Sequence, residues 1–260
     1  MQFCSILSGS SGNCLFVRDR NTSILIDCGL SGKATESGLA VHGISIDTID
    51  GVLVTHEHID HTKGIGVLAR KYKKKIYITK KTFSALPASV GNIPENMLCF
   101  ISNQAFQIGN LNITPFETSH DACDPHGFSI SAGKKKICIA TDTGMITNEM
   151  TENFVGCDFA FIESNHDLAM LKNGSYPPEL KRRILSEFGH LPNTDAAHLS
   201  VWLASKGTKQ IMLGHLSGEN NTEEIALSTT GNALCRAGYP EIASKLLVAS
   251  RYFPSELLEI

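Results

Sequence analysis

The sequence predicts an α/β protein built as a four-layer αββα sandwich, in which two sheets pack face to face and helices cover their outer faces. Short apolar segments rich in β-branched and aromatic residues crowd the first 165 residues and are bounded by Gly, Asn, Asp or Lys. Helical patterns fall between the later segments and near the end of the chain. No repeat, low-complexity segment or Pro/Gly-rich linker interrupts residues 1–260, which favours a single domain.

The elements follow one another along the chain at short intervals. The expected strands are residues 4–7, 14–17, 23–27, 51–55, 75–79, 97–101, 111–116, 127–132, 136–141, 159–164, 211–215 and 245–250. The expected helices are residues 61–72, 178–188, 193–205 and 222–238, with Asn193 and Thr194 as candidate caps of the third. The segment near 165–200 is the most helical, and we expect it to lie over the active site.

Composition sets broad limits on function. The net charge is −3, so no global basic field indicates nucleic-acid binding, and local charge would have to hold a polyanion. No segment has the length of a membrane span, and the start lacks the basic and apolar regions of a signal peptide. The eight cysteines are scattered without a CxxC pair, as expected for reduced thiols in the cytoplasm.

The segment THEHIDH, residues 55–61, places four potential metal ligands directly after an apolar strand. His56 and His58 are two residues apart, so strand alternation would turn both toward the same ion. Asp60 and His61 follow in the turn and can serve a second ion nearby. Two sites are the simpler interpretation, because a single tetrahedral site would leave no room for substrate; the competing interpretation is a solvated polar loop.

Three further ligands are expected where other strands end. His120 ends NITPFETSH, Asp142 ends KICIATD, and His215 ends KQIMLGH. Each lies where an apolar strand meets a polar loop, so all three can face one edge of the sandwich. Taken together with THEHIDH, they predict one metal centre.

This ligand set, together with ILIDCG ending near Asp27, resembles the metallo-β-lactamase superfamily over nearly the whole chain. The resemblance implies which residues bind which metal. The first metal would be bound by His56, His58 and His120, the second by Asp60, His61 and His215, with Asp142 bridging the pair. His and Asp ligands suit Zn²⁺ or Mn²⁺ equally.

Two divalent ions permit hydrolysis by a metal-bridging hydroxide, with Asp60 beside it as a catalytic residue. The cleft would be strongly positive, which favours an anionic substrate such as a phosphodiester. A thioester or lactone would also be polarised, so charge alone leaves both substrate classes open.

The segment FGHLPNTDAAHLSVWLA, residues 188–204, resembles the ribonuclease Z signature. That resemblance implies that His190 protonates the leaving oxygen, with Glu187 or Asp195 as its orienting acid. Imidazole suits this role because its pKa lies near neutral pH. The competing interpretation is a histidine that merely ends a helix.

The segments ILSGSSGNC, ESNHDLAML and GHLSGENN resemble, in this order, the YycJ/WalJ group of metallo-β-lactamase-fold exonucleases. This resemblance implies a 5′→3′ DNA exonuclease, with DNA favoured over RNA as the partner. The Gly-rich loop would offer Ser11 and Asn13 to a phosphate, or simply form a tight turn. Further candidate substrate contacts are Ser217, Asn220, Asn221 and His166, although Asn221 could instead cap the helix that starts near Thr222.

Three alternatives remain open from the sequence. A thioester or lactone hydrolase resembling glyoxalase II shares the HxHxDH pattern, but the extra helical domain of that family is not evident. A ribonuclease Z-like nuclease would act on RNA. A non-catalytic scaffold would have to keep several His and Asp side chains close together without metal, which is costly.

Overall fold

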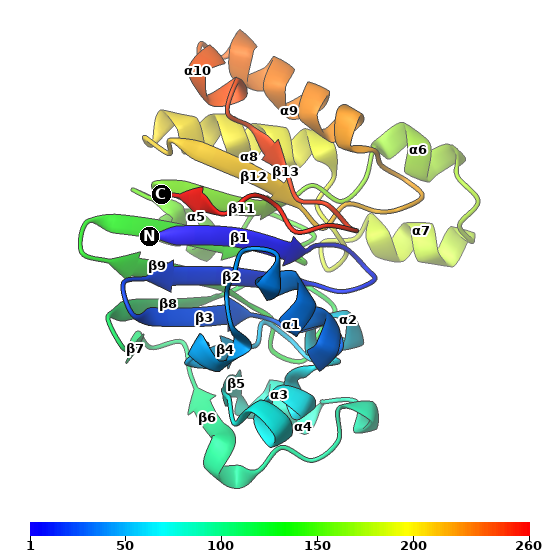
Figure 1. The fold of residues 1–260 in the computed structure, drawn as a ribbon. Helices are drawn as coiled ribbons and strands as arrows, with labels where there is room; N and C mark the ends of the chain where they lie inside the picture. The colour runs from blue at the N-terminus through cyan, green and yellow to red at the C-terminus, as the bar shows by residue number, and fades with distance from the viewer.

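Two seven-stranded sheets form the centre of the protein (Figure 1). The computed structural model describes residues 1–260. The order of the first sheet is β14-β1-β2-β3-β4-β5-β6, and that of the second is β13-β12-β11-β10-β9-β8-β7. The strands of the first sheet are β1 Gln2–Leu7, β2 Cys14–Asp19, β3 Thr22–Ile26, β4 Gly51–Leu53, β5 Lys75–Thr79, β6 Leu98–Ile101 and β14 Leu258–Glu259. Those of the second are β7 Phe106–Ile108, β8 Leu111–Glu117, β9 His126–Ala132, β10 Lys135–Ala140, β11 Phe159–Glu163, β12 Gln210–Gly214 and β13 Leu247–Val248.

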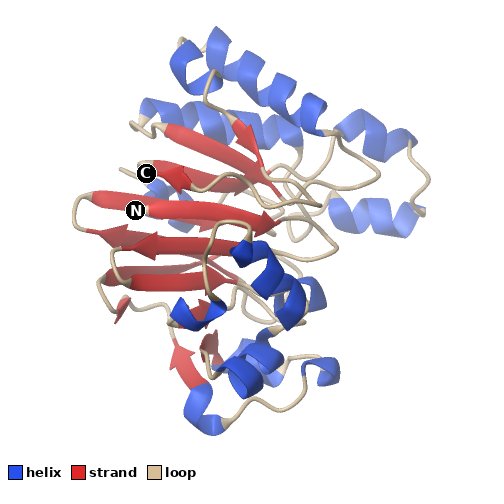
Figure 2. Cartoon of the chain, in the orientation of Figure 1, coloured by secondary structure: helices blue, strands red, loops and turns tan.

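Helices lie outside both sheets (Figure 2). Those that follow strands of the first sheet are α1 Gly32–Ala40, α2 Ile59–Thr62, α3 Ile65–Tyr72 and α4 Lys80–Ser84. Those that pack near the second sheet are α5 Asn148–Phe154, α8 Asn193–Ser205, α9 Glu223–Arg236 and α10 Pro240–Ala243. The short helices α6 Leu168–Asn173 and α7 Pro178–Ile184 project at one end of the sandwich (Figure 1). None of the helices is both long and apolar enough to span a membrane.

Three apolar layers hold these elements together and confirm the predicted αββα sandwich. Between the sheets, Phe3 of β1 packs against Phe159 of β11, with ring centroids 4.5 Å apart. A second cluster joins the first sheet to α1 and α3, and a third joins the second sheet to α5, α8 and α9. Burial of these apolar faces from water is the main force that holds the four layers together.

The structure corrects several local expectations. Residues 61–72 form two helices, α2 and α3, joined at Gly64, where a Cβ would come within 2.2 Å of the Leu30 carbonyl oxygen. Pro192, and not Asn193 or Thr194, occupies the cap position of α8, so Asn193 is free to bond elsewhere. Strands β7 and β14 and helices α1, α4, α5 and α10 were not expected, because these segments are short or weakly patterned.

Candidate metal centre

The expected ligands lie at one edge of the sandwich, in loops and in the short helix α2. His56, His58, Asp60 and His61 follow β4, while His120, Asp142 and His215 follow β8, β10 and β12. Strands β10, β11 and β12 are parallel neighbours, so the loops after them meet at their shared carboxyl edge. His120 lies three residues beyond the end of β8, and the two histidines at 56 and 58 lie beyond β4 rather than within it.

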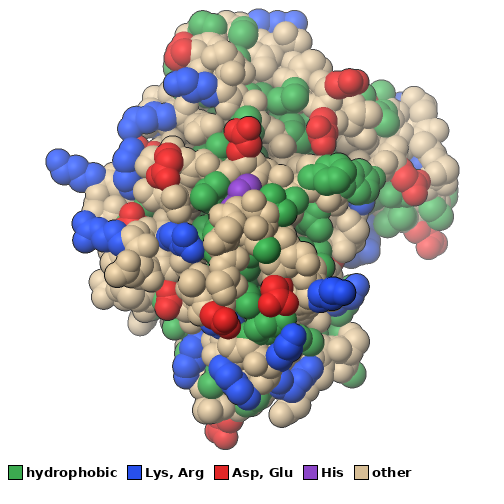
Figure 3. Space-filling model, in the orientation of Figure 1, with side chains coloured by type: hydrophobic (Ala, Val, Ile, Leu, Met, Phe, Trp, Pro, Cys, Tyr) green, Lys and Arg blue, Asp and Glu red, His purple; other side chains and the backbone are tan.

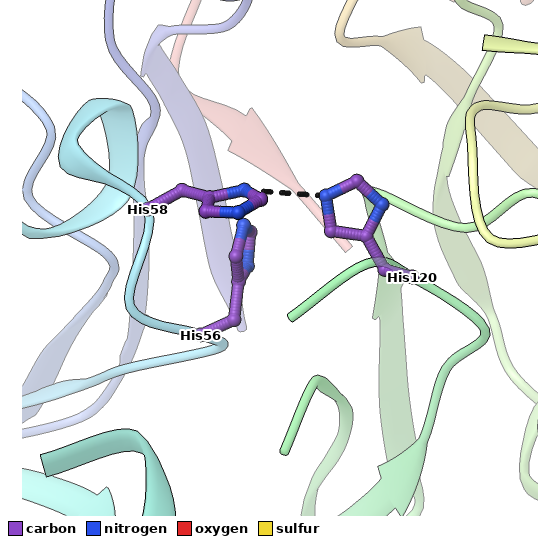
Figure 4. A group of neighbouring side chains, drawn as sticks. All are labelled: His56, His58 and His120. Carbon is purple, nitrogen blue, oxygen red and sulfur yellow. Dashed lines mark hydrogen bonds between the residues drawn. The ribbon is translucent and has the colours of Figure 1, made fainter. Parts of the chain in front are cut away.

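The first group consists of His56, His58 and His120, whose ligand atoms all lie within 4.8 Å of one another. Figure 4 shows the three rings turned toward one another, two from the loop after β4 and one from the loop after β8. The Nε2 atom of His120 lies 3.3 Å from Nδ1 of His58. Three imidazole nitrogens that converge in this way can hold one divalent cation.

A second group, Asp60, His61 and His215, satisfies the same spacing, and Asp142 lies between the two groups. One carboxylate oxygen of Asp142 lies 3.1 Å from Nε2 of His61, and the other lies 3.8 Å from Nε2 of His120. The structure therefore brings together all seven residues expected as ligands, with Asp142 between the two groups.

Hydrogen bonds outside the cluster fix how the rings point. Nδ1 of His61 donates to Asp27, and Nδ1 of His215 donates to Glu163, both at 2.7 Å. Nδ1 of His120 donates to the Gly189 carbonyl oxygen at 3.0 Å. Each of these partners accepts only, so each places the proton on Nδ1 and leaves the lone pair of Nε2 available to a metal.

Several inward atoms have no partner within the protein. Nε2 of His56, Nε2 of His215 and one oxygen of Asp142 are buried without a hydrogen bond. Unpaired buried polar atoms are costly, and cations held by the two groups would satisfy all three. The residues present therefore fit a divalent metal site.

The charges of the protein's own side chains also fit a bound cation. Burial by itself would lower the pKa of His215, but Asp142, Asp60 and Glu163 outweigh it and raise that pKa to about 10. Burial would raise the pKa of Asp142, but the charges of His215 and His61 outweigh it and hold that pKa well below its ordinary value. Without a metal, protons take the place of cations among these carboxylates, so cation binding must release protons.

Backbone strain accompanies three of these positions. Asp27, Asp142 and His215 have φ angles of 61°, 55° and 55°, in the left-handed region that non-glycine residues seldom adopt. Such strain persists only where the surrounding structure over-determines the conformation, and it is concentrated at functional sites.

His190 lies beside the cluster, with Nδ1 3.7 Å from a carboxylate oxygen of Asp142 and a side chain that is 21% exposed. The sequence suggested Glu187 or Asp195 as the acid that orients His190. The structure places a different acid there. Nδ1 of His190 donates to Glu163 at 2.7 Å.

Glu163 is the residue that the sequence reasoning missed. One of its carboxylate oxygens accepts from both His190 and His215, and the other accepts from the main-chain N–H groups of Thr143 and Leu191. Burial by itself would raise the pKa of Glu163, but the charge and hydrogen bonds of His190 and His215 lower it to about 2. An acidic residue at the end of the otherwise apolar strand FAFIE was the available signal.

Three of the expected substrate contacts are buried. His166, Asn220 and Asn221 are 0%, 1% and 6% exposed. The Asn221 amide donates to the carbonyl oxygens of Ser164 and Asn165, so it ties two loops together. It does not cap α9 either, because the hydroxyl of Thr222 does so.

The Gly-rich loop also behaves mainly as a turn. Asn13 is 3% exposed, accepts from the N–H of Gly9, and lies 3.0 Å from Nε2 of His61. The N–H of Gly12 bonds within the loop, so it is not available to a phosphate. Ser11 is exposed and Ser217 is half-buried, which leaves both able to contact a ligand.

A cavity of about 150 Å³ opens beside His190 and His215. Its wall includes Ser10, Ser217 and, from the segment near 165–200, Tyr176 and Arg183. The segment that was expected over the site thus supplies one wall of this cavity.

Residues 22–215 match the family described as the beta-lactamase superfamily domain. The chain is 40% identical to exodeoxyribonuclease YycJ of Bacillus anthracis over 92% of its length and 91% of that protein. It is 38% identical to exodeoxyribonuclease WalJ of Streptococcus pneumoniae over 91% of its length and 89% of that protein.

Solved structures share the fold at low identity. The metallo-beta-lactamase fold protein YhfI from Bacillus subtilis superposes with a TM-score of 0.70 at 17% identity, over 98% of both chains. The short form of human tRNase Z gives a TM-score of 0.65 at 16% identity, over 100% of both chains.

Proposed function

The chain belongs to the beta-lactamase superfamily, in the group that contains YycJ and WalJ, and from this premise we propose that it is a metal-dependent exonuclease that degrades DNA from the 5′ end. The observation that carries the proposal is the convergence of seven His and Asp side chains beside a cavity that holds His190. We further propose that it acts in the cytoplasm, where its eight unpaired thiols would stay reduced.

Two divalent cations would be held by the groups described above, the first by His56, His58 and His120. The second would be held by Asp60, His61 and His215, with Asp142 shared. When bound, such ions activate water near neutral pH and neutralise charge on a phosphodiester.

The protein's own residues then position and protonate the substrate. Glu163 holds Nδ1 of His190, so the other ring nitrogen is the one available to the cavity. From there His190 would donate a proton to the departing oxygen of the cleaved diester. Ser11 and Ser217, the two accessible residues of the expected substrate set, would donate hydrogen bonds to phosphate oxygens.

The test is an assay of purified protein with Zn²⁺ or Mn²⁺ on single- and double-stranded DNA and RNA, labelled at the 5′ or 3′ end. Stepwise release of mononucleotides from the 5′ end of DNA is expected. Cleavage of RNA alone would replace DNA with RNA as the substrate. Hydrolysis of S-lactoylglutathione without cleavage of DNA or RNA would refute the nuclease proposal and favour the thioester hydrolase.

A further inference from the structure

The loop between β13 and β14 exposes two consecutive aromatic side chains. Tyr252 and Phe253 are 73% and 70% exposed, the largest exposures among the big hydrophobic side chains. Their ring centroids are 6.4 Å apart with an interplanar angle of 60°, so the rings meet edge to face. Figure 1 shows this red loop reaching toward the end of the sandwich where α6 and α7 lie. In Figure 3, hydrophobic side chains gather over the same part of the molecule.

Arg251 precedes this pair, and not all of the N–H groups of its guanidinium are hydrogen-bonded. One of its terminal nitrogens donates to the Leu216 carbonyl oxygen at 2.5 Å and approaches the Ser10 hydroxyl at 3.5 Å. Its Nε is buried without a hydrogen-bond partner. These partners are neutral, so the positive charge of Arg251 remains available to an anion.

Arg251 and Tyr252 are continuous with the candidate site. A second cavity, whose lining includes Ser217, Arg251 and Tyr252 as well as the acidic Glu223, shares Ser217 with the cavity beside His190. Ser10, which contacts Arg251, lines that first cavity as well. A chain that leaves the first cavity past Ser217 would therefore meet the cation and then the aromatic rings.

We propose that Arg251, Tyr252 and Phe253 form a nucleotide-binding subsite for the unpaired strand of a nucleic acid. Arg251 binds a backbone phosphate, and an exposed ring of the pair stacks on the adjacent base. The occupant is unpaired, because the faces of bases inside a duplex are covered by their neighbours. This inference rests on the proposed nuclease function and adds strand selectivity to it.

The experiment measures binding separately from cleavage. Fluorescence anisotropy of the metal-loaded protein would use a labelled oligothymidylate with cleavage-resistant phosphorothioate linkages, and the corresponding duplex. The double variant Tyr252→Ala/Phe253→Ala should bind the single strand about tenfold more weakly, as expected for loss of one stacked base, with duplex affinity nearly unchanged. Arg251→Gln should weaken binding and lower the salt dependence of log K by about one phosphate contact.

Matched controls lie elsewhere on the surface. Phe100→Ala removes an exposed aromatic ring on β6, the strand at the opposite edge of the first sheet from β14. Arg236→Gln removes a cation at the far end of α9. Neither change should alter affinity for the single strand.

A conservative variant guards against misfolding. Tyr252→Trp keeps a stacking surface, so it should retain affinity, and its fluorescence should be quenched when the oligonucleotide binds. Unchanged single-strand affinity in the double Ala variant, or no quenching in Tyr252→Trp, would refute the subsite. Self-association that is lost in the double variant, with no change in oligonucleotide binding, would assign the rings to a contact between copies.

Failure of this inference is distinguishable from failure of the proposed function. If the subsite alone is wrong, the double variant cleaves and binds DNA like the unmodified protein. If the nuclease proposal is wrong, the unmodified protein itself neither cleaves nor binds any of the nucleic acids. Hydrolysis of a small phosphodiester, bis-p-nitrophenyl phosphate, is the control for the metal centre. It should be the same in the double variant and the unmodified protein.

Discussion

Glu163→Gln is the substitution that most directly tests how the site is built. The carboxylate of Glu163 accepts from two imidazoles on one oxygen and from two main-chain N–H groups on the other. An amide has one oxygen and one NH₂ group, so neither orientation can satisfy all four donors. If the NH₂ group faces the imidazoles, His190 and His215 must place their protons on Nε2, and His215 then cannot bind a metal through that atom.

The expected size of the effect follows from these contacts. Each buried donor left without an acceptor costs about 1–3 kcal/mol. The low pKa of Glu163 gives a similar figure for the metal-free protein. Folding lowers this pKa from 4.5 to about 2, which corresponds to a stabilisation of about 3 kcal/mol. Because the folded-state pKa is lowered, this stability is present above pH 4.5 and is lost as the pH falls toward 2. We therefore expect a melting temperature lower by roughly 5–10 °C at neutral pH.

Metal binding should respond as well, because loss of a partner that orients a ligand typically costs about 10–100-fold in metal affinity or activity. The assay is titration of metal-free protein with Mn²⁺, followed by electron paramagnetic resonance, together with kcat on labelled DNA. One of the two binding steps should weaken while the other, at His56, His58 and His120, changes little.

Glu187→Gln is the matched control, because the contact of Glu187 with the site region is its main-chain carbonyl, which accepts from the Ser119 hydroxyl. It should behave like the unmodified protein. A Glu163→Gln variant that binds two metals with unchanged affinity and turns over normally would refute this account of the site.

Further substitutions test other parts of the same centre. His58→Ala should lose metal and activity together, measured by elemental analysis and DNA cleavage; normal turnover would contradict the two-metal proposal. His190→Ala should keep its metal content yet cleave diesters about 10²–10⁴-fold more slowly, and an unaltered rate would make His190 structural. Asp27→Asn should weaken metal binding at His61 by about tenfold in competition with a chromogenic chelator, whereas equal affinity would argue against its orienting role. Removal of metal with EDTA should lower the melting temperature, since an ion bound only to the folded state stabilises it; coincident melting curves would be the contrary result.

The fold class and the ligand set could be read from the sequence because both depend on local patterns. Apolar runs of strand length, punctuated by turn residues, predicted most of the strands, and helical spacing predicted residues 193–205 as the helix α8. THEHIDH and the polar residues after three later strands indicated a metal centre, because His and Asp beside apolar strands have few structural reasons to occur together. Strands of two or three residues, such as β7 and β14, were missed because they carry too little pattern.

The contacts between distant segments required the tertiary structure. Glu163 ends β11, and only the parallel alignment of β11 with β12 brings it to His215, while the loop before α8 brings it to His190. The burial of His166, Asn220 and Asn221 could not be predicted from the sequence either. Polar residues that follow a strand have the same local pattern whether they face solvent or another loop.

By itself the sequence determined which chemical groups this protein possesses and that they follow strands, because residue type and strand pattern are properties of neighbouring residues. The tertiary structure decided which acid orients which histidine, and which loops line the cavity. Those pairings depend on the order and register of strands far apart in the chain, which local patterns do not specify.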